Sequence, residues 1–166
     1  RVSTFLPVSP GVFASYDTEE WPRVAEKYFR GCLYQAANGF CPFCEGRLNV
    51  AVAARVQTDD SSADPPPEHS DTPMVRYGCE RCGEEIASDV GSALVHRPSV
   101  VAFYHDNGVN VRTAPLSRFQ TMDSDAVRTR GRDPLRIAVT YTAGRETLTL
   151  VVDRELRVRE RDRSDR

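Results

Sequence analysis

The chain has 166 residues, of which 40% are hydrophobic, and a formal net charge of −2. This length allows one ordinary domain or two small ones with a hydrophobic core. No apolar run approaches the roughly 18 residues that a membrane span needs, and no charged segment precedes a hydrophobic one as in a secretion signal. We therefore expect a cytoplasmic protein with no membrane contact, and the net charge does not indicate a nucleic-acid binder.

The strongest helical pattern covers residues 20–37, after an N-terminal strand or loop remnant at residues 1–18. Asp17 and Glu20 have the spacing of a capping box, and Asn38-Gly39 supplies a C-terminal stop. Apolar residues recur between them at i, i+3, i+4 and i+7. We expect this stripe to pack into the core, with Cys32 as a small buried residue. The alternative is a homodimer interface formed by Trp21, Val24, Tyr28 and Phe29.

Two C-x-x-C units follow the helix, Cys41-Pro42-Phe43-Cys44 and Cys79-Glu80-Arg81-Cys82, with 34 residues between them. Such a turn lets two thiolates of one tight loop reach one ion, and four thiolates complete the tetrahedral shell of Zn²⁺. Gly46 and Gly83 follow the two units, where we expect sharp bends with positive φ. The spacing predicts one structural zinc ion with four ligands: Cys41, Cys44, Cys79 and Cys82.

Other uses of these residue types fit the sequence less well. A disulfide framework would leave one of the five cysteines unpaired, and a thioredoxin-like centre needs only one C-x-x-C. His96 and His105 are possible metal ligands, but four thiolates already fill a structural site, so we expect them to cap or pack. His69 is expected to be solvated.

The segments around the two units indicate strands. Apolar and polar residues alternate over residues 48–56, and residues 74–77 form a second short strand that leads to the second C-x-x-C unit. Residues 57–73 contain three consecutive prolines and five acidic residues, which predicts a mobile loop. This is the layout of a zinc ribbon. Residues 84–87 can add a third strand, and short helices are expected after Ser88 or Asp89 and from Pro98 to Gly108.

The C-terminal part has a different pattern. Residues 134–160 alternate with period two and contain two turns, which predicts an antiparallel β-meander with one apolar face. Its third strand is expected to begin with Leu156 and Val158. Residues 113–133 are expected to be a linker and residues 161–166 a flexible tail. Arg128, Arg130 and Arg132 in the linker suit phosphate binding, although the acidic residues nearby favour a solvated, self-neutralising surface.

These elements predict an α+β fold. It comprises a four-cysteine zinc ribbon with a preceding amphipathic helix, short following helices and a C-terminal antiparallel β-meander. The helix, the ribbon and the following helices are expected to form one unit over residues 19–112.

Several of these motifs together resemble a known family. Its match runs from Trp21 through both C-x-x-C units to the stretch Gly91–Val109, which contains His96, Pro98 and His105. These residues look like the C-terminal region of haloarchaeal ArsR-like winged-helix transcriptional regulators. The resemblance implies an archaeal regulatory domain whose DNA-binding winged helix lies outside this chain. Three features depart from it: the winged helix and the cysteines of an earlier ribbon are missing, and the acidic loop 57–73 is longer.

We therefore expect a non-catalytic regulatory or interaction module that contains one structural zinc ion. One alternative is a zinc ribbon that itself contacts nucleic acid through Arg128, Arg130 and Arg132. Another is a thiolate-zinc sensor of oxidants or metals. An enzyme is not expected, because four cysteines close the metal shell and no nucleophile–base pair, phosphate loop or paired acids are placed by a motif.

Overall fold

Two antiparallel sheets form the framework of the chain, whose computed structural model describes residues 8–53, 73–119 and 126–165. The first sheet has the order β1-β2-β3, with β1 Leu48–Ala53, β2 Met74–Cys79 and β3 Glu85–Asp89. The second has the order β4-β5-β6-β7, with β4 Val127–Arg132, β5 Leu135–Ala143, β6 Glu146–Val152 and β7 Val158–Asp165. The mixed helix and strand content confirms the α+β class, and the four cysteines cluster at one end of the first sheet, as in a zinc ribbon.

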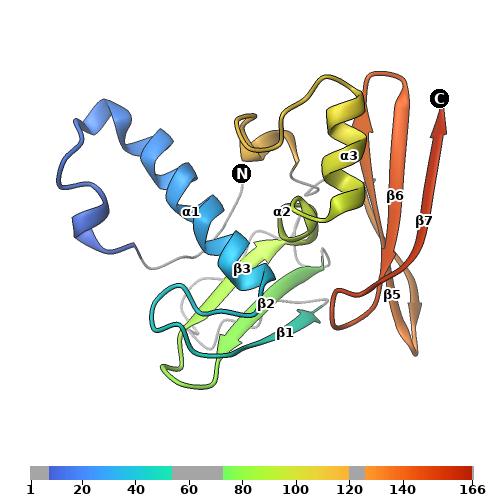
Figure 1. The fold of residues 1–166 in the computed structure, drawn as a ribbon. Coiled ribbons are helices and arrows are strands. Elements are labelled where there is room, and N and C mark those ends of the chain that lie inside the picture. The colour runs from blue at the N-terminus through green and yellow to red at the C-terminus, as the bar shows by residue number, and fades with distance from the viewer. Residues whose placement is uncertain (1–7, 54–72, 120–125, 166) are drawn as a thin grey trace, which may run out of the picture.

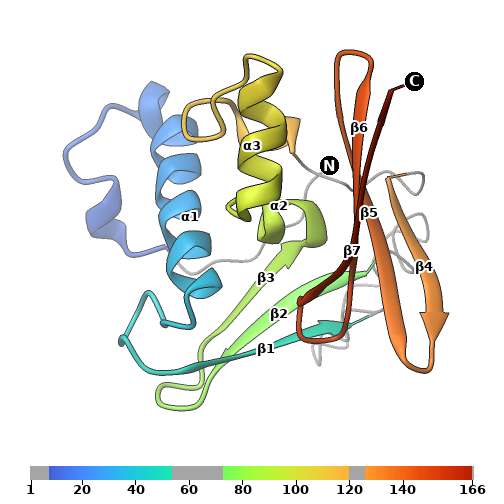
Figure 2. The same ribbon diagram turned by 45° about the vertical axis from the view of Figure 1, so that its right-hand side comes forward.

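The helices lie on one side of the four-stranded sheet (Figures 1 and 2). They are α1 Trp21–Ala37, α2 Val90–Leu94 and α3 Pro98–Asp106, with short 3-10 turns η1 Pro10–Val12, η2 Thr18–Glu20 and η4 Leu116–Arg118. Figure 2 shows α3 between α1 and the four-stranded sheet. Among the described residues, no helix combines the length and hydrophobicity that crossing a bilayer requires.

The helix ends follow the capping signals of the sequence. Asp17 and Glu20 form the expected capping box ahead of α1, and Gly39 takes a φ of 84° just after its end. The Asp89 carboxylate caps α2 by accepting the Ser92 N–H at 2.9 Å. These contacts satisfy backbone groups that a helix end leaves without an internal partner. Gly108, with a φ of 70°, likewise follows α3.

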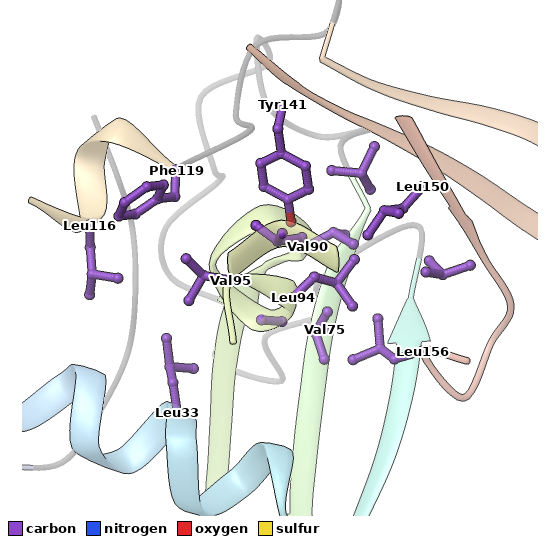
Figure 3. Packing of buried hydrophobic residues seen from close by; sticks show 14 of the residues in the cluster. Leu33, Val75, Val90, Leu94, Val95, Leu116, Phe119, Tyr141, Leu150 and Leu156 are labelled. Atoms are coloured by element: carbon purple, nitrogen blue, oxygen red, sulfur yellow. The ribbon is translucent and has the colours of Figure 1, made fainter. Parts of the chain in front are cut away.

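One hydrophobic cluster joins both sheets and all three helices. Figure 3 shows Leu33 of α1 and Val75 of β2 approaching the α2 segment from one side, and Tyr141 of β5 approaching it from another. Tyr141 is buried, and its hydroxyl donates to the Gly91 carbonyl at 2.9 Å. The zinc-ribbon sheet and the β-meander therefore share a core, and their relative placement is fixed by packing.

Polar contacts also join the loop between β6 and β7 to the first sheet and to the connection between α2 and α3. The Val52 N–H of β1 donates to the Arg154 carbonyl at 2.9 Å, and the Arg97 guanidinium donates to the Leu156 carbonyl at 3.0 Å. The buried Asp153 carboxylate accepts the backbone N–H groups of Glu155 and Arg157 and so fixes the turn. This loop thereby connects the meander to the edge of the first sheet.

The structure corrects three details of the C-terminal prediction. Residues 127–132, expected within a linker, form β4, and the expected flexible tail continues β7 as far as Asp165. Leu156, expected to start a strand, lies in a turn at a φ of 57° and is 4% exposed. The sequence does not predict β4 and predicts β7 only as far as residue 160, because both are edge strands with almost no buried side chains, and their charged residues mask the usual alternation.

Some sequence predictions fall on residues outside the described ranges. They include the loop with His69 and most of residues 57–73, the end of the first predicted strand at residues 54–56, and the first seven residues. Residues 8–18 contain η1 and the start of η2, and no strand is found in that described stretch.

Candidate metal centre

The first C-x-x-C unit is a tight turn between α1 and β1. The Glu45 N–H donates to the Cys41 carbonyl at 2.8 Å, and the Cys41 N–H donates to the Gly46 carbonyl at 2.8 Å. Phe40 and Arg47 pair as an antiparallel bridge at the base of the turn. The chain thus reverses between the helix and the strand, which directs Cys41 and Cys44 toward the same space.

Gly46 is required here for space, and the positive φ expected of it belongs instead to Glu45, at 61°. A Cβ atom at Gly46 would lie 2.8 Å from the Arg81 Cβ and 3.2 Å from the Sγ atoms of Cys44 and Cys79. Contacts this short are not compatible with ordinary packing. The glycine therefore lets the two C-x-x-C turns approach each other.

The second C-x-x-C unit begins at the last residue of β2. Its turn is closed by the Gly83 N–H, which donates to the Cys79 carbonyl at 3.1 Å, and by the Cys79 N–H, which donates to the Glu84 carbonyl at 3.0 Å. Gly83 has a φ of 76°, as the sequence predicts. The pairing of Leu48 with Cys79 sets this turn opposite the first one at the same end of the hairpin.

The four Sγ atoms of Cys41, Cys44, Cys79 and Cys82 all lie within 4.8 Å of one another. Between the two turns, the Cys41–Cys82 separation is 3.7 Å and the Cys44–Cys79 separation is 3.5 Å. Sulfurs at about 2.3 Å from a tetrahedral zinc ion would be about 3.8 Å apart, whereas a disulfide requires about 2.05 Å. The cluster therefore has the dimensions of a four-thiolate metal site, and all five cysteines are unbridged.

The four cysteines of the cluster differ in their exposure to solvent. Cys41 and Cys79 are buried and belong to the hydrophobic core, Cys44 is half-buried and Cys82 is exposed. One side of the centre is thus anchored in the folded body while the other faces solvent.

Electrostatics among the thiols also suit a bound cation. The backbone N–H of Cys82 stabilises the Cys79 thiolate, together with that of Arg81, and the pKa of Cys79 falls to about 6. At Cys82 the N–H of Glu84 favours the thiolate, but burial and the neighbouring thiols outweigh it and raise the pKa to about 12. Cys79 therefore ionises readily, whereas Cys82 resists the addition of a further negative charge to the cluster. A bound metal cation removes this repulsion between thiolates.

Contacts between the two turns include residues that the sequence analysis did not single out as supports. The Arg81 guanidinium donates to the Cys44 carbonyl at 3.2 Å, and the Asn49 amide donates to the Glu80 carboxylate at 2.8 Å. The period-two pattern placed Asn49 on the polar face of its strand. The contact of Asn49 with Glu80 depends on the register between β1 and β2, which no local motif in the sequence reveals.

The remaining candidate metal ligands lie elsewhere. Cys32 is buried in α1, as expected, and burial raises the pKa of its thiol. The His96 ring packs edge-on against Tyr34 with ring centroids 5.3 Å apart, and burial, aided by Arg30 and Arg112, lowers its pKa. His105 is exposed in the last turn of α3. Within the described residues, the metal-ligand cluster contains only the four cysteines.

The arginines proposed for nucleic-acid contact lie on the edge strand β4, within the second sheet. Arg128, Arg130 and Arg132 are exposed, and the Arg130 guanidinium lies 3.8 Å from the Glu160 carboxylate of β7. An acidic residue, Glu160, therefore shares this surface with the arginines.

The four residues of the alternative homodimer interface lie in different surroundings. Phe29 packs against the core, whereas Val24 and Tyr28 line a surface groove. Trp21 is 44% exposed, and its ring lies against Phe13 at 5.1 Å between centroids. Val24, Tyr28 and Phe29 are half-buried, and of these four residues only Trp21, at the start of the helix, is exposed.

Comparison with known families adds one match. The family model for DUF7351, a domain of unknown function, matches residues 1–158. The chain belongs to this family. Searches of curated proteins and of solved structures returned no match. For this DUF7351 chain, the argument for function therefore depends on the thiol cluster and its surroundings.

Proposed function

We propose that the chain is a non-catalytic module in which Cys41, Cys44, Cys79 and Cys82 bind one structural zinc ion. The supporting observation is the set of four sulfurs within 4.8 Å of one another. Four thiolates fill a tetrahedral shell and leave no position for a water or substrate, whereas catalytic zinc keeps one position open. Bound there, zinc would supply a fixed crosslink between the two turns.

The surroundings of the cluster support a role for the metal in folding. Cys41 and Cys79 belong to the same hydrophobic cluster as both sheets. Structural zinc contributes roughly 10–16 kcal/mol in zinc-finger peptides, against about 5–15 kcal/mol for the stability of a typical domain. Removing the metal should therefore unfold the β1-β2-β3 sheet.

The resemblance to ArsR-like regulators supports a regulatory role for this module in an archaeal cytoplasmic transcription factor. In that proposal the winged helix outside this chain binds DNA, and this module offers surfaces to partners. Sequencing the encoded protein upstream of Arg1 and measuring DNA binding by the full-length product tests it. A full-length protein with no DNA-binding domain and no affinity for DNA would overturn the regulatory part and leave the zinc part intact.

The zinc proposal is tested by Cys79→Ser, with Cys32→Ser as a matched control. Cys79 belongs to the cluster, whereas Cys32 is a buried cysteine outside it. We expect one zinc per chain in the wild type and in Cys32→Ser, measured by elemental analysis, and loss of zinc together with loss of amide protection in β1, β2 and β3 for Cys79→Ser. Full zinc content and an unchanged melting curve in Cys79→Ser would contradict the proposal.

Solvent exposure of Cys82 favours one second candidate, a thiolate-zinc redox sensor. Peroxide would oxidise two thiolates to a disulfide, itself being reduced to water, and the metal would be released. Zinc release at micromolar peroxide, reversed by a reductant, would favour the sensor. Retention of zinc under those conditions would contradict the sensor and leave only the structural role.

A further inference from the structure

A groove lies beside the N-terminal half of α1, apart from the contacts that hold this helix in the fold. Arg30 donates to the Ala114 carbonyl at 2.6 Å, and Glu26 accepts the Leu116 N–H at 3.0 Å. These contacts join α1 to the segment after α3. The groove lies between α1 and the N-terminal segment with η1 and η2, which Figures 1 and 2 show beside the first turns of the helix.

Most of the groove lining comes from one stripe of side chains that begins just before α1. These residues recur at i, i+3, i+4, i+7 and i+8, which places them on one helix face: Glu20, Arg23, Val24, Lys27 and Tyr28. Val12 and Tyr16 of the N-terminal segment complete the lining. The groove therefore combines apolar and aromatic surface with charged groups.

Contacts of Trp21 and Phe13 hold the N-terminal segment against α1. The Trp21 indole N–H donates to the Tyr16 carbonyl at 3.2 Å, and the rings of Trp21 and Phe13 lie 5.1 Å apart between centroids. The Tyr16 N–H donates to the Phe13 carbonyl at 3.1 Å, which closes the turn after η1. Both walls of the groove are thus fixed by the chain itself.

Positive charges outnumber negative ones in the groove. Arg23 and Lys27 provide two cations against the single carboxylate of Glu20. That carboxylate accepts the Asp17 N–H at 3.3 Å as part of the capping box. In the described parts of the chain, neither Arg23 nor Lys27 takes part in an ion pair. The groove therefore favours an anionic occupant.

The volume of the groove favours a small molecule over a segment of protein. It is about 290 Å³, close to the lower end of the range of roughly 300–1,000 Å³ for ligand pockets. One turn of an α-helix with its side chains fills on the order of 400 Å³, so a second helix does not fit. Tyr16 and Tyr28 offer aromatic surface from the two walls, which suits a flat apolar body.

We propose that this groove binds a small aromatic carboxylate. Arg23 and Lys27 bind the carboxylate through charge-assisted hydrogen bonds. Tyr16, Val24 and Tyr28 cover the ring. The site lies outside the thiol cluster, so this inference goes beyond the zinc proposal and either can fail without the other. It gives the module an effector site on the helix that leads to the metal centre.

NMR titration of the zinc-loaded, isotope-labelled chain with 2-naphthoate tests the proposal. For a ligand of about 13 non-hydrogen atoms in an open groove, we expect a Kd of about 0.1–1 mM. The amide shifts should saturate and be largest within residues 12–28. Naphthalenemethanol, which keeps the ring but not the charge, should bind at least about fivefold more weakly. Acetate, which keeps the charge but not the ring, should not bind below about 10 mM.

Variants of Lys27 test the recognition of charge. Lys27→Glu reverses the charge and should weaken naphthoate binding at least about tenfold, whereas Lys27→Arg should bind within about twofold of the wild type. Arg145→Gln removes an exposed arginine from the turn between β5 and β6 and should bind like the wild type. Because Lys27 is exposed, its variants should keep the folded spectrum outside the groove.

The absence of a saturable shift up to about 10 mM naphthoate would overturn the proposal. So would saturable shifts confined to residues outside 12–28, because the site would then lie elsewhere. Binding that Lys27→Glu leaves unchanged would also overturn it, because the groove would not recognise the carboxylate.

Discussion

Replacement of Gly46 by alanine tests whether the two C-x-x-C turns must touch. The added methyl group would lie 2.8 Å from the Arg81 Cβ and 3.2 Å from the Sγ atoms of Cys44 and Cys79. None of these atoms lies at the far end of a flexible side chain, so relief requires the turns to move apart. Overpacking of this kind costs about 1–3 kcal/mol. For a chain of this length that corresponds to a fall in Tm of about 2–12 °C.

The affinity for zinc should fall for the same reason, because the displaced turns contain the ligands. Residues that support metal ligands typically change affinity by 10–100-fold when altered, so Gly46→Ala should lose zinc to a competing chromogenic chelator at least about tenfold more readily. Gly78→Ala is the matched control, because Gly78 directly precedes Cys79 and a Cβ there would meet no atom of the described residues within 4 Å. The control should match the wild type in zinc affinity and melt at the same temperature or slightly higher.

Equal melting and equal zinc affinity in Gly46→Ala and Gly78→Ala would refute the argument. The two turns would then tolerate a methyl group between them, and the close approach of Gly46 to the sulfurs would contribute nothing to stability or zinc affinity.

Two further predictions concern the core and the loop between β6 and β7. Burial raises the pKa of Asp153, but hydrogen bonds from Arg157, Arg159 and Glu155 outweigh it and hold the pKa below its usual value. Its contribution is therefore present above pH about 4 and is lost as the pH falls through the lower folded-state pKa. Asp153→Asn should cost about 1–2 kcal/mol at pH 7 by urea unfolding, and a deficit that stayed constant below pH about 4 would contradict this. Tyr141→Phe removes the donor to the Gly91 carbonyl and should cost about 1 kcal/mol, and an unchanged midpoint would show that the bond adds no net stability.

Local chemistry made much of the fold predictable. The limits of α1 followed from the Asp17–Glu20 capping box and the Asn38-Gly39 stop, because these signals act within a few residues of the helix end. The convergence of the four cysteines followed from the C-x-x-C spacing, because the geometry of zinc ligands restricts the turns that can present them. Motifs that satisfy local geometry can be recognised without knowledge of long-range contacts.

Features that depend on distant contacts were not predictable. The β4 segment has Val127 as its one buried residue, and β7 has none, so no apolar face reveals β4 or the part of β7 beyond residue 160. Both segments become strands because β4 pairs with the edge of β5 and β7 pairs with the edge of β6. The contact between Gly46 and the second turn is also long-range, and the sequence suggested only that a glycine was needed there.

The central claim, that four cysteines of this chain form a closed zinc site, is tested most directly by zinc X-ray absorption spectroscopy on the purified protein. The thiol cluster predicts a first shell of four sulfurs at about 2.3 Å, with no lighter ligand. A shell that contains oxygen or nitrogen at about 2.0–2.1 Å would contradict the closed site, as would a folded protein that purifies without zinc and does not bind it when supplied.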